Sequence, residues 1–126
     1  MANASDNRPL SPHLQVYRWP LNMAMSIFHR ITGVGLAVTA ILVTWYFLAL
    51  ATGPEYFETA SAVLTSWFGD IVMFLSLVAL WFHFMNGIRH LVWDTGSSFG
   101  QRRVYRSGIA AIVAAVVMTI ITVIVA

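Results

Sequence analysis

Residues 31–51 read ITGVGLAVTAILVTWYFLALA and contain no ionisable side chain except Tyr46. About 20 apolar residues in a helix cross the roughly 30 Å hydrocarbon layer of a bilayer, and this stretch reaches that length alone. Two later apolar runs, 71–88 and 108–126, reach it once their flanking residues are included. None of the three alternates with the period of a barrel strand. The sequence therefore predicts an all-α membrane protein with three transmembrane helices, at about 22–51, 66–92 and 107–126.

The first apolar run is expected to remain in the chain as a membrane span. Residues 49–51, Ala-Leu-Ala, do fit the small-x-small pattern of a signal-peptide cleavage site. However, the run is longer than the roughly 7–15 apolar residues of a signal core, and a long polar segment precedes it. Cleavage after this run is therefore not expected.

The composition also indicates a protein whose solvent is lipid. Hydrophobic residues make up 59% of the 126 residues and charged residues only 10%, whereas soluble domains average about 25% charged. The length suits one compact unit, so we expect residues 1–126 to form a single membrane-anchor domain. The chain has no cysteine, which excludes disulfides, thiolate-held iron–sulfur clusters and zinc-thiolate sites within it.

The orientation of the helices follows from the distribution of arginines. The positive-inside rule places Arg-rich connections in the cytoplasm. Arginines precede or open the first apolar run, or lie between the second and third runs, at Arg8, Arg18, Arg30, Arg89, Arg102, Arg103 and Arg106. The connection between the first two runs has no Arg and contains Glu55 and Glu58. We therefore expect a cytoplasmic N-terminal segment, residues 1–21, with Tyr17 and Trp19 at headgroup depth.

Polar residues in or beside membrane spans are costly and are therefore candidates for function. One group opens the first helix and consists of Ser26, His29, Arg30 and Gly33. The spacing i, i+3, i+4, i+7 puts all four on one helical face. The structural alternative is that Arg30 only extends its charged group toward the lipid headgroups and that the Ser26 hydroxyl forms a hydrogen bond with the backbone of its own helix. Three polar side chains on one face favour a binding site over that alternative.

A second polar group closes the second helix. Its members are His83, Asn86, Gly87, Arg89, His90 and, just beyond, Asp94. His83, Gly87 and His90 share a face, because seven residues make nearly two full turns. Gly87 leaves room for a large group to lie against the backbone. A histidine inside a membrane helix needs a hydrogen-bond partner or a metal, so this face is a candidate cofactor site.

Haem is the metal group that best fits these residues, because it is flat, largely apolar, bound by His, and carries propionates that attract Arg and His. His83 and His90 lie about 10 Å apart along one helix, so they cannot ligate the same iron. His29 lies just outside the charge-free run of the first helix, whereas His83 lies five residues inside the charge-free run of the second helix. This offset predicts that the two histidines differ in membrane depth by roughly 10 Å. We therefore expect His83 to be one axial ligand of the haem iron and another subunit to supply the second. His29, Arg30 and His90 would then lie near the propionates or a quinone head.

Three segments together resemble a known family. They are residues 8–14 (RPLSPHL), 26–33 (SIFHRITG) and 83–94 (HFMNGIRHLVWD). In this order and with this three-helix layout, they resemble the cytochrome b556 subunits of succinate dehydrogenase, over nearly the whole chain. Each motif is short, but three in register with the expected topology make the resemblance specific.

The resemblance implies one of two membrane anchors of respiratory complex II in the bacterial cytoplasmic (inner) membrane. The partners would be a second anchor, a flavoprotein and an iron–sulfur subunit, with FAD and the clusters held only by the last two. It maps an axial ligand of a shared haem b onto His83, the quinone pocket onto Ser26 and Arg30, and a place near the propionates onto His29. This chain would then contribute binding groups to succinate:ubiquinone oxidoreductase, while its cofactors carry the redox chemistry.

Other functions remain open at this stage. A structural anchor without haem could use the same fold, and a related subunit could serve fumarate reduction instead of succinate oxidation. A transport or channel subunit would place polar residues at several depths. Here they gather toward the cytoplasmic side, and the third apolar run offers only Thr119 and Thr122. This distribution favours a membrane anchor over a transport path.

Overall fold

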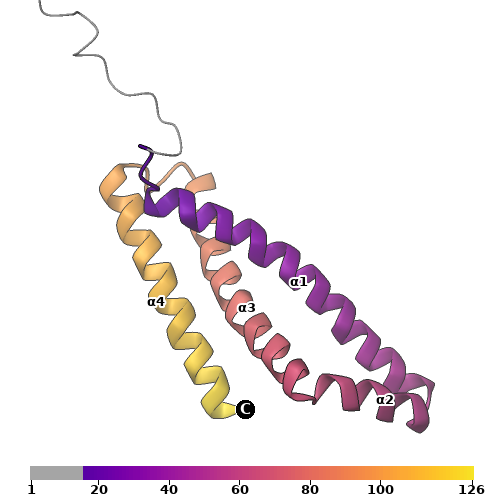
Figure 1. Ribbon diagram of the computed structural model, residues 1–126. Helices are drawn as coiled ribbons and strands as arrows, with labels where there is room; N and C mark the ends of the chain where they lie inside the picture. Colours follow the sequence, from indigo (N-terminus) through magenta and orange to yellow (C-terminus); the bar gives the residue numbers. More distant parts are fainter. Residues whose placement is uncertain (1–15) are drawn as a thin grey trace, which may run out of the picture.

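The computed structural model describes residues 16–126, and in that part of the chain it consists of helices and connecting segments without strands. The helices are α1 (Leu21–Thr52), α2 (Pro54–Leu64), α3 (Trp67–Asp94) and α4 (Gln101–Val125) (Figure 1). Helices α1, α3 and α4 are long and apolar enough to cross a membrane. The predictions of an all-α class and of three spans are therefore confirmed.

The spans begin and end close to the predicted residues, except at the start of α4. This helix begins at Gln101, six residues before the predicted start at 107. Gly100 precedes it with a φ of 127°, a conformation that favours glycine and separates the helix from the preceding loop. The hydropathy pattern shows where the charged residues end and the apolar run begins, and the helix starts before that point. Arg102, Arg103 and Arg106 therefore lie on the first turns of a helix and not in a loop.

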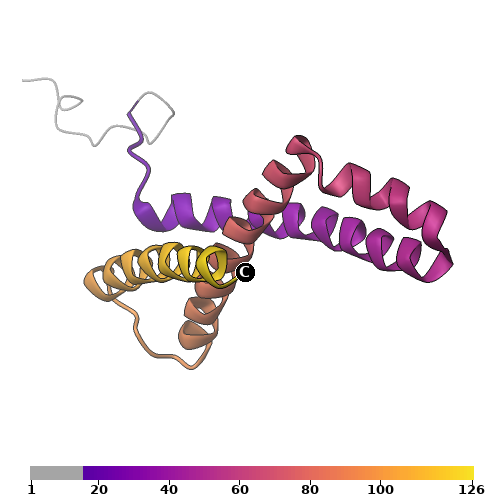
Figure 2. The same cartoon turned by 90° about the horizontal axis from the view of Figure 1, so that it is seen from below.

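A short helix that the sequence analysis did not predict, α2, joins the first two spans. It follows Gly53, which has a φ of 146°, and Pro54 stands in its first turn, where a proline is well tolerated. Figure 2 shows α2 folded back beside the second half of α1. The indole Nε1 of Trp45 donates to the hydroxyl of Tyr56 at 2.8 Å. The Gly-Pro pair was the sequence signal for this helix.

The three spanning helices meet at one end and diverge from there. In Figure 1 the start of α1, the end of α3 and the start of α4 lie together, and α1 and α4 then run apart. Gly108 allows the close approach, because a Cβ there would lie 2.9 Å from the sulfur of Met25 on α1. Met25 is itself buried. The functional candidates on α1 and α3 lie near this junction.

Burial in this chain is inverted relative to a soluble protein. Long apolar side chains lie outside, with Val34 70% and Ile124 77% exposed, whereas Asn86 is fully buried and Arg89 is 6% exposed. In water, the exposure of such a large apolar surface would be energetically costly. The pattern fits a chain that is surrounded by lipid or by other membrane helices and that packs polar groups between its own helices.

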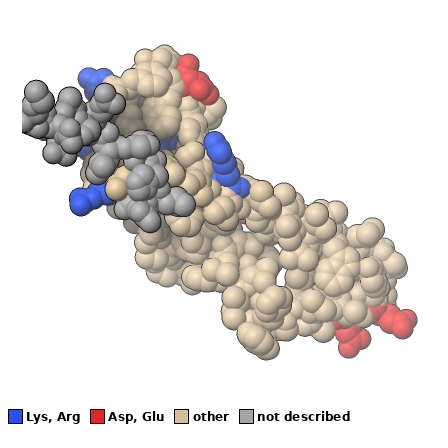
Figure 3. Space-filling view, turned by 45° about the horizontal axis from the view of Figure 1, so that its top comes forward, with Lys and Arg blue, Asp and Glu red and all other residues tan. Residues whose placement is uncertain are grey.

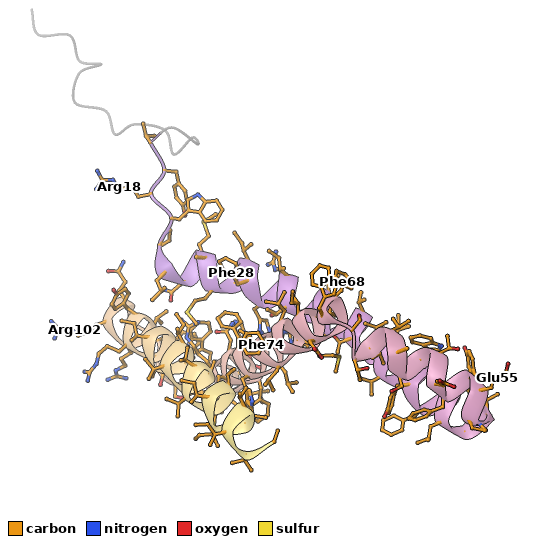
Figure 4. All side chains as sticks on the ribbon, turned by 60° about the horizontal axis from the view of Figure 1, so that its bottom comes forward. Arg18, Phe28, Glu55, Phe68, Phe74 and Arg102 are labelled. Atoms are coloured by element: carbon orange, nitrogen blue, oxygen red, sulfur yellow. The ribbon has the colours of Figure 1, made fainter. Side chains whose placement is uncertain are left out.

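Charge is distributed unequally between the two ends of the molecule. On the face shown in Figure 3, arginine side chains gather at the end where α1 and α4 begin, which also carries acidic atoms, whereas the end formed by α1 and α2 carries acidic side chains without basic ones. In Figure 4, Arg18 and Arg102 lie at the first of these ends and Glu55 at the second. Most of the predicted N-terminal segment 1–21, including motif 8–14, lies outside the described residues. The cytoplasmic placement of that segment stays a prediction.

Candidate functional site

His83 of α3 is held against α1 by its ring nitrogen Nδ1. This atom lies 3.0 Å from the carbonyl oxygen of His29 and 3.2 Å from the hydroxyl of Thr32. A carbonyl oxygen can only accept, so Nδ1 carries the proton and donates it to His29 O. This tautomer leaves Nε2 without a proton, and the described residues offer Nε2 no hydrogen-bond partner. This is the arrangement that orients a histidine as a metal ligand.

His29, His83 and His90 form one cluster at the junction of α1 and α3. The rings of His29 and His83 are stacked with centroids 3.9 Å apart, and those of His29 and His90 are 5.0 Å apart. The predicted depth difference of roughly 10 Å between His29 and His83 is therefore wrong. That prediction assumed that the charge-free runs of both helices begin at the same depth, and the packing of α1 on α3 does not keep them so.

Two glycines shape the surroundings of His83. A Cβ on Gly33 would lie 3.0 Å from Cε1 of His83, so this glycine lets the imidazole lie directly against the backbone of α1. Gly87 lies one turn after His83, and a Cβ there would meet no other atom within 4 Å. The described part of the chain thus leaves open space beside Gly87, on the face that was predicted to accommodate a large group.

Ser26 and Arg30 lie one turn apart on α1, beside His29. Arg30 is exposed and Ser26 is half-buried. The hydroxyls of Thr32, Thr39 and Thr44 each donate to the carbonyl four residues earlier, but within residues 16–126 no such bond engages Ser26. Both side chains therefore keep donors that could reach an acceptor on a bound molecule.

The sequence as a whole places the chain among known proteins. Residues 4–122 match the model of the succinate dehydrogenase/fumarate reductase transmembrane subunit. The chain belongs to this family. It is 44% identical over 119 residues to the succinate dehydrogenase cytochrome b556 subunit of Paracoccus denitrificans, covering 94% of this chain and 92% of that one. The resemblance inferred from the three motifs is therefore confirmed.

Family members from bacteria and from mitochondria are similar to this chain over most of its length. The cytochrome b556 subunit of Rickettsia bellii is 33% identical, with 92% of this chain and 90% of that one covered. The mouse mitochondrial cytochrome b560 subunit is 37% identical, with 90% of this chain and 69% of the mouse protein covered. Both relatives are named as subunits of succinate dehydrogenase, so the present chain is related to subunits of that enzyme.

Arg89, a member of the polar group predicted to close the second helix, is buried between three helices. Its guanidinium donates to Ser107 Oγ at 3.0 Å and to Val104 O at 2.9 Å on α4. It also donates to Asn22 Oδ1 of α1 at 2.7 Å and to Asn86 Oδ1 of its own helix at 3.2 Å. The sequence placed Arg89 in the polar group that closes the second helix and used its charge for orientation, but it did not predict these contacts with two other helices. Its place inside the predicted span 66–92 was the signal for a buried role.

The polar groups deeper in the bundle are hydrogen-bonded to one another. Thr39 and Ser76 join α1 to α3 at 2.8 Å, and Trp81 Nε1 donates to Thr122 of α4 at 2.9 Å. Hydrogen-bonded pairs of this kind stabilise the packing of membrane helices. Among the described residues, the buried side-chain atoms without a hydrogen-bond partner are His29 Nδ1, Asn86 Nδ2 and Trp93 Nε1.

Proposed function

We propose that this chain is the membrane-anchoring cytochrome b subunit of a succinate:ubiquinone oxidoreductase in the bacterial cytoplasmic membrane. The observation that carries the proposal is the hydrogen bond from His83 Nδ1 to His29 O, which leaves Nε2 free to ligate a metal. Membership of the family and the names of the relatives support it. A second anchor, a flavoprotein and an iron–sulfur subunit would complete the enzyme, and the last two would hold FAD and the clusters.

The residues of the His83 cluster fit a haem b shared with the second anchor. His83 would supply one ligand to the haem iron, and the open space beside Gly87 would admit the edge of a large flat group. His29 cannot be the second ligand in this arrangement, because its ring lies face to face with His83 instead of opposite to it across a metal. We assign the second ligand to the other anchor, and His29, Arg30 and His90 to the vicinity of the propionates. When bound, the haem supplies a one-electron redox centre within the membrane.

Ser26 and Arg30 would form this chain's share of the ubiquinone site. Electrons from succinate would pass through the partners' flavin and clusters to ubiquinone, whose carbonyl oxygens accept hydrogen bonds. The serine hydroxyl and the guanidinium can both donate to those oxygens. As negative charge builds up on the quinone oxygens, the fixed charge of Arg30 would stabilise it. The role of the protein here is to bind and orient the quinone head and to stabilise its developing charge.

The proposed topology puts this site on the cytoplasmic side. The arginines of α4 and the start of α1 lie at one end of the molecule (Figure 3), and basic residues near the ends of spans remain in the cytoplasm. The Glu-bearing end, with α2, would face the periplasm. The soluble subunits would then dock at the end where the three spans meet, close to Ser26 and His83.

A purified wild-type complex tests the proposal as a whole. With an affinity tag on this chain, we expect the flavoprotein, the iron–sulfur subunit and a second anchor to copurify, with succinate-dependent reduction of ubiquinone. The reduced-minus-oxidised visible spectrum should show a low-spin haem b. An active complex without that spectrum would support the haem-free anchor instead. Preferential oxidation of a quinol with fumarate as acceptor would support the fumarate-reducing alternative.

A further inference from the structure

Arg89 is a buried cation that the proposed reaction does not use. Its side chain is 6% exposed, and within residues 16–126 no carboxylate forms a salt bridge with it. The guanidinium instead donates four hydrogen bonds to neutral oxygens, and its Cζ lies 4.1 Å from the ring centroid of Trp93. Burying a charge is costly unless it is hydrogen-bonded, so the number of these contacts is what makes its burial tolerable.

The contacts of Arg89 connect all three spanning helices at one level. Its Nε and NH2 groups reach Ser107 and Val104 near the start of α4, and NH2 also reaches Asn22 in the first turn of α1. The planar fork of a guanidinium can make these bonds simultaneously, whereas a lysine ammonium cannot reproduce its geometry. The bond of 2.7 Å to Asn22 is the shortest of the four.

The position of Asn22 relates this network to the proposed quinone residues. Asn22, Ser26 and Arg30 follow one another at intervals of four residues and so lie on neighbouring turns of the same side of α1. Within residues 16–126, the other side-chain hydrogen bonds between α3 and α1 are those of His83 with His29 O and Thr32 and that of the Thr39–Ser76 pair. The segment that carries Ser26 is therefore fixed to α3 by His83 on one side and by Arg89 on the other.

We propose that Arg89 is a positioning residue that acts through Asn22 to set the place of Ser26 and Arg30 for the quinone head. This inference rests on the proposed function. The bond between Arg89 and Asn22 fixes the rotation and the distance of the first turns of α1 relative to α3. Misplacement by about 1 Å of groups that orient a substrate can lower a rate substantially. The network is thus expected to matter to the quinone reaction beyond its contribution to folding.

The test replaces the acceptor and leaves Arg89 in place. In the purified complex, Asn22→Leu removes the bond, but the NH2 group of Arg89 keeps Val104 O as a partner. Asn22→Asp keeps an acceptor at the same position. Thr39→Val is the matched control, because it removes another bond between α1 and α3, to Ser76, away from the proposed site. Ser26→Ala is measured beside them, to test the quinone site itself.

We expect Asn22→Leu to raise the KM for ubiquinone about tenfold. Asn22→Asp and Thr39→Val should keep the wild-type KM, and succinate oxidation by a dye fed from the flavin should not change in any of these variants. A wild-type KM in Asn22→Leu, with Ser26→Ala impaired, would overturn the positioning role alone. Wild-type kinetics in Ser26→Ala would overturn the quinone assignment and this inference with it. Parallel loss of dye and quinone activities in Asn22→Leu would show a role in assembly only and would also overturn the inference.

Discussion

Two glycines two residues apart on α1 allow a direct test of the packing around His83. A Cβ on Gly33 would lie 3.0 Å from Cε1 of His83, whereas a Cβ on Gly35 would meet nothing within 4 Å. Carbon atoms in optimal contact are about 3.5–4.0 Å apart, so Gly33→Ala requires a displacement of roughly 0.5 Å or more. Gly35→Ala makes the same chemical change in the same helix without that displacement.

The displacement acts on the hydrogen bond that orients His83. If the imidazole moves away from α1 by that amount, the distance of 3.0 Å from Nδ1 to His29 O approaches about 3.5 Å, where a hydrogen bond is nearly lost. The loss costs about 1 kcal/mol. Replacing a glycine in a helix by alanine increases the stability of the helix by about 1 kcal/mol. Because these terms nearly cancel, the thermal stability of the complex should change little, and the haem is the better reporter.

The expected result is a shift of the haem midpoint potential in Gly33→Ala alone. A histidine that donates from Nδ1 is a more basic ligand, and a basic ligand favours ferric iron. Weakening that bond should therefore raise the potential, and a tenfold change in relative affinity corresponds to about 59 mV for one electron. Redox titration of the visible spectrum measures it. Unchanged potentials in Gly33→Ala, or equal shifts in Gly35→Ala, would refute the argument.

Two further predictions concern the quinone site and the topology. In purified Arg30→Ala and Ser26→Ala complexes, dye-linked succinate oxidation should persist. Ubiquinone reduction should fall at least about tenfold, which corresponds to a loss of roughly 1.4 kcal/mol of transition-state stabilisation. Equal loss in both assays would indicate an assembly role. On intact cells, an impermeant thiol reagent should label Thr59→Cys on α2 but not Gln101→Cys at the start of α4, and the reverse labelling would invert the orientation.

The sequence was sufficient for the spans because each needs only a run of apolar residues long enough for the bilayer. Residues 31–51 show this directly. It did not predict the start of α4, since the first turns of that helix carry Arg102, Arg103 and Arg106 and do not contribute to an apolar run. Helix α2 was also missed, because its 11 residues are too few and too polar to register as a span.

The sequence predicted which residues form the candidate site better than it predicted how those residues are arranged. His29, Gly33 and His83 were selected as polar or small residues at helical spacing, and the structure brings them into contact. Their relative depth could not be obtained from either helix alone, because it depends on how α1 packs against α3. The contacts of Arg89 could not be predicted for a similar reason. Its partners Asn22 and Ser107 come from two other helices, and such contacts have no sequence period.

The proposed role of this chain depends above all on the ligation of a haem b by His83. The most direct measurement is the reduced-minus-oxidised spectrum of purified complexes that carry His83→Ala, with His90→Ala as the control from the same face of α3. We expect His83→Ala to abolish or alter the low-spin haem spectrum while the chain still inserts and copurifies with its partners. His90→Ala should keep that spectrum and shift only the haem potential or the quinone kinetics. An unchanged haem spectrum and potential in His83→Ala would contradict the assignment.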